Sequence, residues 1–306
     1  MCGIVGLFAK SPDVESRLGE LLSNMLIEMT ERGPDSTGVS FYRHPVGPSE
    51  TKLLVYSADP DYAWEGGVHD DLKKAFGHRV QFAVHASHAL TVLPVEAETA
   101  QSWFWKNHPE LRVISAGTVI ETYKEKGLPR DIIERFGLRA FSGTHALGHT
   151  RMATESEVTT EHSHPFSTGQ DLCLVHNGSL SNHNRLRDRL RAEGIRFETD
   201  NDSEVAAGYL TWRLRQGASL EQALESALED LDGFFTFAIG TRDGFAVIRD
   251  VIGCKPGVIA ETDDWVAMAS EYRAFAGLPG VEHANVWEPA PATVYSWNRS
   301  ETRADH

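Results

Sequence analysis

The sequence begins MCGIVGLF at residues 1–8, and its apolar run from Ile4 to Phe8 predicts a short buried strand. From Leu18 to Met29, apolar side chains repeat at the three- and four-residue spacing of one helical face, and Gly33-Pro34 ends that pattern. A strand at this position fixes the N-terminal residues in a sheet rather than letting them fray. We therefore expect the start of the chain to be held in the fold.

Groups of strand-like segments alternate with groups of helix-like segments along the rest of the chain. The expected strands are 39–43, 51–58, 81–93, 145–153, 171–178, 234–240, 244–251, 265–270 and 294–297, and the expected helices are 130–136, 182–193, 203–215 and 220–231. This alternation is typical of an α+β fold in which antiparallel sheets pack together and are covered by helices. No repeat or low-complexity linker divides residues 1–306, so we expect a single domain.

The composition narrows the classes of partner. The 306 residues include 44 acidic and 29 basic side chains, a formal charge of −15. Such a chain repels phosphate backbones and anionic lipid, so neither nucleic acid nor a membrane is an expected partner. No secretory signal and no run of about 18 apolar residues is present. The three cysteines, Cys2, Cys173 and Cys254, are too few and too scattered for a disulfide framework, which fits a reducing cytoplasm.

Cys2 is the candidate nucleophile. Removal of Met1, which a small second residue favours, leaves Cys2 with a free α-amine, whose ordinary pKa of about 8 suits it to accept the thiol proton. A thiol needs such a base because only a small fraction is ionised near neutral pH. Taken alone, a cysteine near a chain end is more simply a small apolar residue at a mobile terminus. Other motifs decide between the two interpretations.

Eight short motifs lie far apart in the sequence: MCGIVG (1–6), RGPDSTG (32–38), GHTRMAT (148–154), SHPF (163–166), LVHNGSL (174–180), DSE (202–204), IRDVIGCKP (248–256) and MASEYRAF (268–275). In this order they resemble those of the class II glutamine amidotransferases. The resemblance implies the four-layer αββα fold of N-terminal-nucleophile hydrolases. It covers nearly the whole chain except an insertion of unassigned role at about residues 44–143.

The resemblance also implies roles for five residues. Cys2 matches the family cysteine that forms a γ-glutamyl thioester, and Asn177 and Gly178 match the pair that stabilises the oxyanion. Arg151 matches the arginine for the carboxylate of L-glutamine, and Asp202 the acidic residue for its ammonium. Taken singly, an Asn-Gly pair is most often a hairpin turn, Arg151 would be a solvated surface arginine, and Asp202 would be an N-cap of the following helix.

Further pocket positions of the family correspond to Thr154 and His164, and Arg32 lies in the loop that helps to order the surroundings of the nucleophile. The family often has an aromatic residue and a histidine where this chain has Met152 and Glu155, so the pocket wall is expected to differ. Histidine pairs such as 85/88, 145/149 and 162/164 lack the spacing of a zinc site, and no metal is expected.

The acceptor of the ammonia is expected on another polypeptide, because amidotransferase motifs occupy both ends of the sequence. The long segment between RGPDSTG and GHTRMAT resembles the glutamate synthase and N-methylglutamate synthase type, which implies a separate synthase subunit, with flavin as a possible cofactor of that partner and no cofactor in this chain. The chain is then part of a homo- or hetero-oligomer. Two alternatives stay open: a free-standing N-terminal-cysteine amidase acting on γ-glutamyl or other small amides, and a catalytically idle glutamine-sensing or scaffold subunit.

Overall fold

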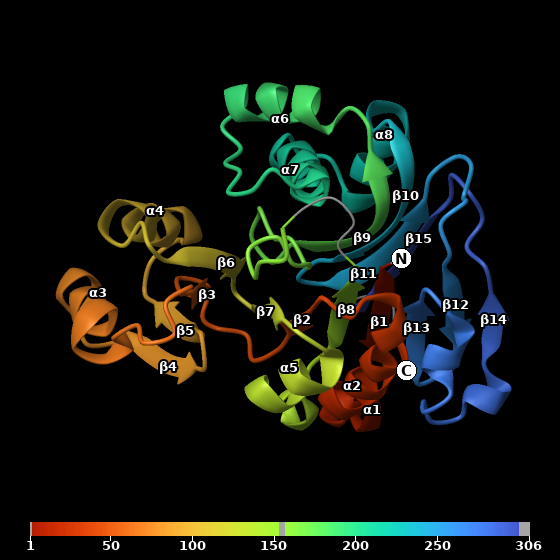
Figure 1. Cartoon of the computed structure of the whole chain (residues 1–306), viewed down its shortest axis with the longest axis horizontal. Coiled ribbons are helices and arrows are strands. Elements are labelled where there is room, and N and C mark those ends of the chain that lie inside the picture. The colour runs from red at the N-terminus through yellow and green to blue at the C-terminus, as the bar shows by residue number, and fades with distance from the viewer. Residues whose placement is uncertain (1, 153–156, 300–306) are drawn as a thin grey trace.

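A computed structural model describes residues 2–152 and 157–299, and its core consists of two antiparallel sheets packed face to face (Figure 1). The larger sheet has the strand order β14-β12-β13-β1-β8-β2-β7, and the smaller sheet has the order β15-β11-β10-β9. The strands of the larger sheet are β1 (Gly3–Ala9), β2 (Ser36–Tyr42), β7 (Ile120–Lys126), β8 (His145–Arg151), β12 (Val258–Glu261), β13 (Trp265–Ala269) and β14 (Asn285–Trp287). Those of the smaller sheet are β9 (Cys173–Leu180), β10 (Gly233–Gly240), β11 (Gly244–Arg249) and β15 (Val294–Asn298).

Helices cover both outer faces of this pair of sheets. On the outer face of the larger sheet lie α1 (Pro12–Ser16), α2 (Leu18–Glu28) and α5 (Pro129–Phe136). Against the smaller sheet lie α7 (Asp202–Arg215) and α8 (Leu220–Asp230), and α6 (His183–Ala192) packs on α7. Short 3-10 turns are η1 (Thr30–Arg32), η3 (Leu138–Ala140), η4 (Tyr272–Phe275) and η5 (Val281–His283). The predicted α+β sandwich with four layers, αββα, is confirmed.

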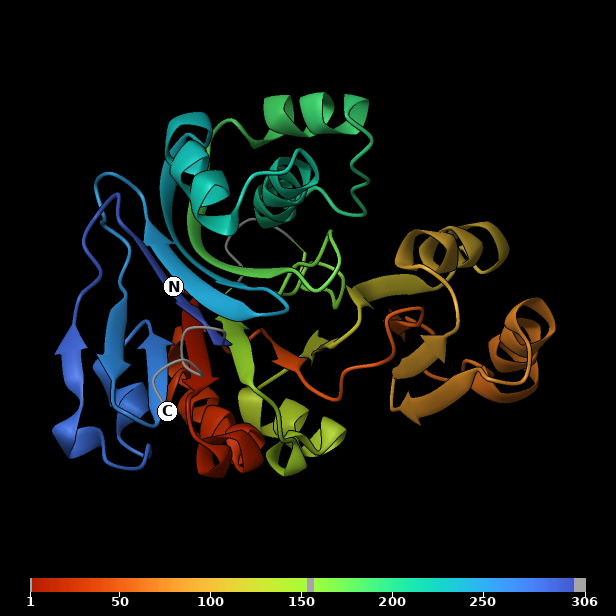
Figure 2. The same ribbon diagram turned by 180° about the vertical axis from the view of Figure 1, so that it is seen from behind.

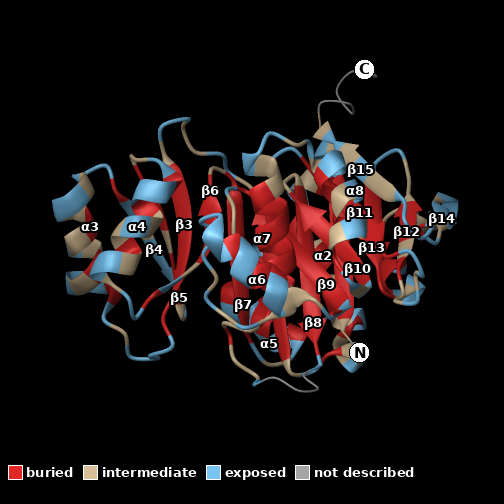
Figure 3. Cartoon of the chain, turned by 90° about the horizontal axis from the view of Figure 1, so that it is seen from above, coloured by how far each residue is buried: buried red, intermediate tan, exposed pale blue. Residues whose placement is uncertain are grey.

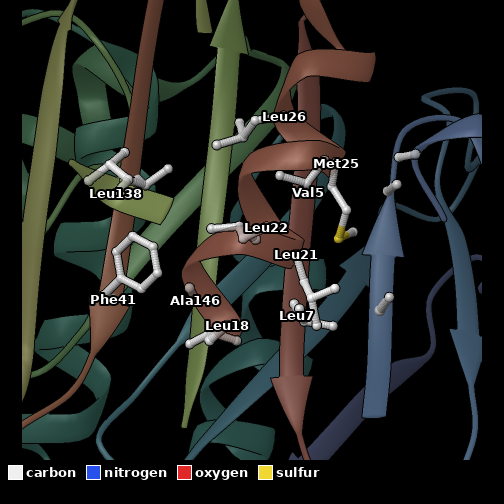
Figure 4. Close-up of a cluster of buried hydrophobic side chains, with 14 of the residues drawn as sticks. Val5, Leu7, Leu18, Leu21, Leu22, Met25, Leu26, Phe41, Leu138 and Ala146 are labelled. Atoms are coloured by element: carbon white, nitrogen blue, oxygen red, sulfur yellow. The ribbon is translucent and has the colours of Figure 1, made fainter. Parts of the chain in front are cut away.

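The sequence of β1 explains why two layers pack on it. Successive side chains of a strand point to opposite faces, and Val5 and Leu7 belong to the apolar cluster that includes α2, whereas Ile4 and Phe8 belong to the cluster between the sheets. Figure 4 shows Leu22 and Leu26 among the α2 side chains that pack toward the larger sheet. Because both faces are covered, the strand is apolar throughout and entirely buried.

Residues 51–117 form a third sheet beside this core, with strand order β4-β5-β3-β6 (Figure 2). Its strands are β3 (Thr51–Tyr56), β4 (Gln81–His85), β5 (His88–Leu93) and β6 (Arg112–Gly117), and its helices are η2 (Trp64–Val68), α3 (His69–Phe76) and α4 (Ala97–Asn107). The single strand expected over residues 81–93 was wrong: Ala86, at φ +53°, turns the chain so that β4 and β5 form a hairpin. This sheet has its own apolar cluster around Phe104.

Figure 3 shows which elements are buried. The strands of the two core sheets are mostly buried, whereas the outward faces of α3, α4 and α6 are exposed. Within residues 2–152 and 157–299, no helix has the length and apolar character needed to cross a membrane.

Candidate active site

Cys2 and Arg151 lie at neighbouring strand ends of the larger sheet. Gly3, the first residue of β1, pairs with Thr150 of β8, so the residues that flank this pair are adjacent. A side chain at position 3 would not fit, because its Cβ would lie 2.7 Å from Thr150 Oγ1 and 2.8 Å from Met29 Cβ. The glycine therefore lets β1 approach α2 and β8 closely at the point where Cys2 leaves the sheet.

Two donors from different parts of the chain hold the backbone carbonyl of Cys2. Arg32 Nε donates a hydrogen bond to it over 2.9 Å, and Asn177 Nδ2 donates another over 3.3 Å. Arg32 also forms an ion pair with Glu271, with Nη1 2.7 Å from Oε1, and Arg273 Nε lies 2.8 Å from Glu271 Oε2. The hydrogen bond from Arg32 lowers the pKa of the Glu271 carboxyl. Arg32 thus contacts the backbone of Cys2, the candidate nucleophile.

Asn177 and Gly178 lie inside β9, so the alternative interpretation of this pair as a hairpin turn was wrong. They pair with Thr236 and Phe235 of β10, and the strand continues to Leu180. The Asn177 side chain is buried and directed at Cys2. Gly178 has φ +154°, and a Cβ there would lie 1.8 Å from the Phe234 carbonyl oxygen. Only glycine brings its backbone this close to β10.

Asp202 is the first residue of α7, and it connects that helix to β9. Its Oδ2 accepts a hydrogen bond from the Leu180 N–H over 2.9 Å. The N-cap of the helix is Asn201, whose side-chain oxygen accepts from the Ser203 N–H over 2.8 Å, so the simpler interpretation of Asp202 as the cap was wrong. Asp202 lies beside β9 at the N-terminus of α7, with 21% of its side chain exposed.

Arg151 ends β8 with its side chain buried rather than solvated at the surface. Its exposed fraction is 5%, and its Nη1 donates to the Glu157 carbonyl over 3.1 Å. A buried guanidinium at this edge is a fixed positive charge beside Cys2. Thr154, the other residue expected from this segment, lies outside the described residues.

His164 lies beneath the strand that carries Asn177. Its ring stacks on that of His149 with centroids 4.0 Å apart, and its Nδ1 accepts from the His176 N–H over 3.3 Å. Burial lowers the pKa of His149 to about 3, and it lowers the pKa of both His164 and His176 as well. These imidazoles are therefore neutral near pH 7, and His164 supports β9 from below.

Sequence reasoning missed several residues that connect the site. His176 Nδ1 lies 2.8 Å from Ser203 Oγ, which donates to Asp202 Oδ1 over 3.2 Å. Ser270 Oγ accepts from the Ile4 N–H over 2.9 Å, next to Glu271. His176, Ser203, Ser270 and Glu271 all lie within the motifs quoted above. Their position in those motifs was the available signal. No group of three or more His, Cys, Asp or Glu side chains that could hold a metal ion occurs among the described residues.

A family model described as "Glutamine amidotransferase domain" matches residues 149–277. The "Glutamine amidotransferase-like protein GlxB" of Rhizobium meliloti is 52% identical over 302 residues, which cover 98% of this chain and 99% of that protein. A protein of Methanothermobacter thermautotrophicus is 30% identical, and the alignment covers 96% of this chain and 99% of that one.

Among solved structures, the glutamine phosphoribosylpyrophosphate amidotransferase from B. subtilis superposes with a TM-score of 0.62 at 20% identity. The match covers 98% of this chain and 48% of that one. At this identity the likeness concerns the fold, which agrees with the four layers described above.

Proposed function

The chain belongs to the class II glutamine amidotransferases, an enzyme family, and from this premise we propose that it hydrolyses L-glutamine to glutamate and ammonia through a thioester on Cys2. The observation that carries the proposal is the contact between the two core sheets at Cys2. β1 supplies the cysteine, and β9 supplies Asn177, which hydrogen-bonds its carbonyl, while Asp202 of α7 is bound to the same strand through the Leu180 N–H. The proposal includes Met1 removal, which frees the α-amine.

In the proposed first step, the Cys2 sulfur attacks the side-chain amide carbon of glutamine, and the thiol proton passes to the Cys2 α-amine. The tetrahedral intermediate collapses as its C–N bond breaks, and the proton transferred from the α-amine completes the leaving ammonia. Water then adds to the γ-glutamyl thioester, the C–S bond breaks, and glutamate and the free thiol are regenerated. The sum is glutamine plus water giving glutamate plus ammonia.

The oxyanion of that intermediate needs donors already in place. An amide nitrogen carries two N–H donors, and one from Asn177 is used on the Cys2 carbonyl. The second remains for the oxyanion, together with the Gly178 N–H. This division lets one side chain both hold the nucleophilic residue and stabilise the charge that its attack creates.

Substrate selection rests on two opposite charges. Arg151 would bind the α-carboxylate of glutamine, and the partly exposed Asp202 would bind its α-ammonium. Because Asp202 Oδ2 is already fixed by the Leu180 N–H, its position relative to β9, and so to Asn177, is set by the backbone. His164 acts in this proposal as a support of β9 rather than as a direct contact of glutamine.

The test is to incubate the purified chain with L-glutamine and measure ammonia and glutamate, which should appear in equal amounts. Mass spectrometry of the intact protein should show loss of Met1 and, after acid quenching during turnover, a γ-glutamyl adduct on the peptide that begins with Cys2. Turnover by protein that retains Met1, or an adduct at Cys254 instead, would contradict the mechanism.

The acceptor of the ammonia belongs to the same proposal. We place it on a separate synthase subunit of the glutamate synthase or N-methylglutamate synthase type, with flavin as the partner's cofactor, in a reducing cytoplasm that keeps Cys2 as a thiol. The support is that two relatives align with this chain over 99% of their own length. Co-purification of a flavoprotein that raises glutamine turnover would agree with this assignment, and full turnover by the isolated chain, unchanged by any co-purifying protein, would contradict it.

A further inference from the structure

A cavity of about 370 Å³ lies between the third sheet and the two-sheet core. Its walls come from α4 and β6 on one side and from residues 194–199 and α7 on the other, with Lys124 of β7 and the segment that includes Phe166 also lining it. Cys2, Asn177, Arg151 and Asp202 do not line it. In Figure 1, β6 extends from the third sheet toward the core elements that form the other wall.

Direct contacts hold the two walls together. Trp105 Nε1 donates to Glu198 Oε1 over 3.1 Å, and the Arg196 guanidinium lies 4.4 Å from the centroid of the Trp105 ring. Arg215 of α7 lies 3.7 Å from Glu98 of α4. The cavity therefore opens to solvent between two regions that contact each other, and its size is within the range of small-molecule sites.

The positive groups of the cavity are only partly used. Lys124 is 4% exposed, and its ammonium donates to the carbonyls of Glu161 and Ser163 over 3.1 and 2.8 Å, below the Phe166 ring. Within the described parts of the chain, the Arg112 guanidinium has no hydrogen bond and no ion pair, although it lines the same cavity. Beside them, the buried Ser167 Oγ has no hydrogen-bond partner among the described residues.

Negative groups face the same space. Among residues 2–152 and 157–299, the Glu161 carboxylate has neither a hydrogen bond nor an ion pair, and Glu198 bonds only to the Trp105 indole. Partial withdrawal from water raises the pKa of the Glu198 carboxyl, while the pKa of Lys124 is lowered to about 8 by burial. Apart from the Arg215–Glu98 pair, charged groups of both signs thus line one cavity, and Arg112 and Glu161 form no ion pair among the described residues.

We propose that this cavity binds a small zwitterion, an α-amino acid, at a site separate from that of the amide substrate. The ligand carboxylate would pair with Arg112 and accept from Ser167 Oγ, with Lys124 adding positive potential from the floor, and the ligand ammonium would pair with Glu161 and Glu198. A zwitterion satisfies both sets at once, whereas a simple anion or cation leaves the opposite set unpaired in a partly dry site. Trp105, Ile195 and Phe166 supply apolar surface for a side chain.

The test is calorimetric titration of the full-length Asp202→Asn variant, in which the substrate pocket has lost its ammonium partner, with each of the twenty L-amino acids. We expect saturable binding of at least one of them at a stoichiometry of one. Its analogue without the amino group and its analogue without the carboxylate should each bind at least tenfold more weakly. The proposal is overturned if no amino acid binds saturably at ligand concentrations up to about 10 mM, the weak end of specific binding. Equally tight binding of either analogue would also overturn it.

Matched variants locate the site. Arg112→Gln and Glu161→Gln should each weaken binding about tenfold or more, the scale of one lost charged contact. Arg79→Gln and Glu65→Gln remove exposed charges of the third-sheet unit that do not line the cavity, and they should leave binding unchanged. If all four variants bind alike, the site lies elsewhere and the proposal is wrong. When the four substitutions are made in the otherwise unaltered chain, all four variants should still hydrolyse glutamine, which separates this test from that of the proposed function.

Discussion

The two-sheet core and the third sheet differ in what their buried surfaces do. In the core, apolar clusters on both sides of β1 hold a strand end beside which polar side chains of β8 and β9 lie. In the third sheet, one apolar cluster around Phe104 stabilises a unit that contributes no residue to the candidate active site. The comparison teaches that the chemistry depends on how the core layers are joined, while the third sheet is stabilised separately and shapes only the neighbouring cavity.

Removal of the Cys2 sulfur should have the largest effect on the core. Cys2→Ala should lower glutamine turnover by more than about 10⁴-fold, because no other group replaces the nucleophile. Ammonia release is the measurement. Cys254→Ala, at an exposed cysteine, is the control and should keep full activity. Comparable losses of activity in the two variants would show that the assignment of Cys2 as the nucleophile is wrong.

The next largest effect tests the facing sheet. Asn177→Ala should lower kcat by about 10²–10³-fold with little change in the thermal midpoint, since it removes one oxyanion donor. Asn107→Ala removes an exposed asparagine of α4 in the third sheet and should leave kcat unchanged. A rise in KM alone would show that Asn177 acts on binding rather than on the intermediate.

A smaller loss of activity is expected for Glu271, which contacts Arg32 and not Cys2 itself. Glu271→Gln weakens the ion pair that fixes Arg32 on the Cys2 carbonyl and should lower kcat/KM about tenfold, the scale of a weakened charge-assisted hydrogen bond. Glu31→Gln is the matched control, because Glu31 contacts Arg273 but not Arg32. The rate of Cys2 alkylation by iodoacetamide should change in the first variant only.

The third sheet should respond in stability and not in turnover. Phe104→Ala, at a fully buried ring, should destabilise this unit by about 3–5 kcal/mol. Hydrogen exchange should increase in β3–β6, while kcat stays within about twofold because none of the site residues is in contact with that cluster. A loss of kcat comparable to that of Asn177→Ala would show that the two regions are coupled more closely than the contacts indicate.

The smallest expected effect is the loss of stability at acid pH, to which a buried histidine of each region contributes. Burial lowers the pKa of His88 in β5 to about 3, as it does for His149 in β8, whereas an unfolded histidine titrates near 6.5. The unfolded chain therefore binds more protons below pH 6.5, so stability is full above that pH and falls as the pH approaches 3. Between pH 6.5 and 5 each histidine should cost about 2 kcal/mol. Urea titrations of His88→Asn should show a weaker pH dependence than those of the unaltered chain.

Periodicity in the sequence predicts the core well because its elements are amphipathic or wholly apolar. The Leu18 to Met29 pattern corresponds to α2, and the expected helices correspond to α5, α6, α7 and α8. The third sheet was harder to predict because α3 and α4 place few buried side chains on their inner faces, and the β4–β5 turn uses Ala86, not a glycine.

The candidate site shows what sequence motifs leave out. They singled out Cys2 and Asn177, which the structure places together, but a motif does not say which atom a side chain reaches. Arg32 was expected to help order the surroundings of Cys2, but only the structure identifies the Cys2 carbonyl oxygen as the atom that it contacts. The roles of His176 and Glu271 likewise depend on contacts between segments more than 25 residues apart. Such long-range hydrogen bonds leave no periodic trace in the sequence.

The pairing of β3 with β6 has one more consequence. Lys52 lies opposite Gly117, so the chain leaves the core and returns to it through two adjacent strands. When the ends of an inserted segment are neighbours, a change in its length alters the stability of the core little, because the entropy of loop closure grows only with the logarithm of length. The segment between Lys52 and Gly117 can therefore be shortened to a tight turn or exchanged for another module. Its two ends are a natural point for grafting and for evolutionary change in size.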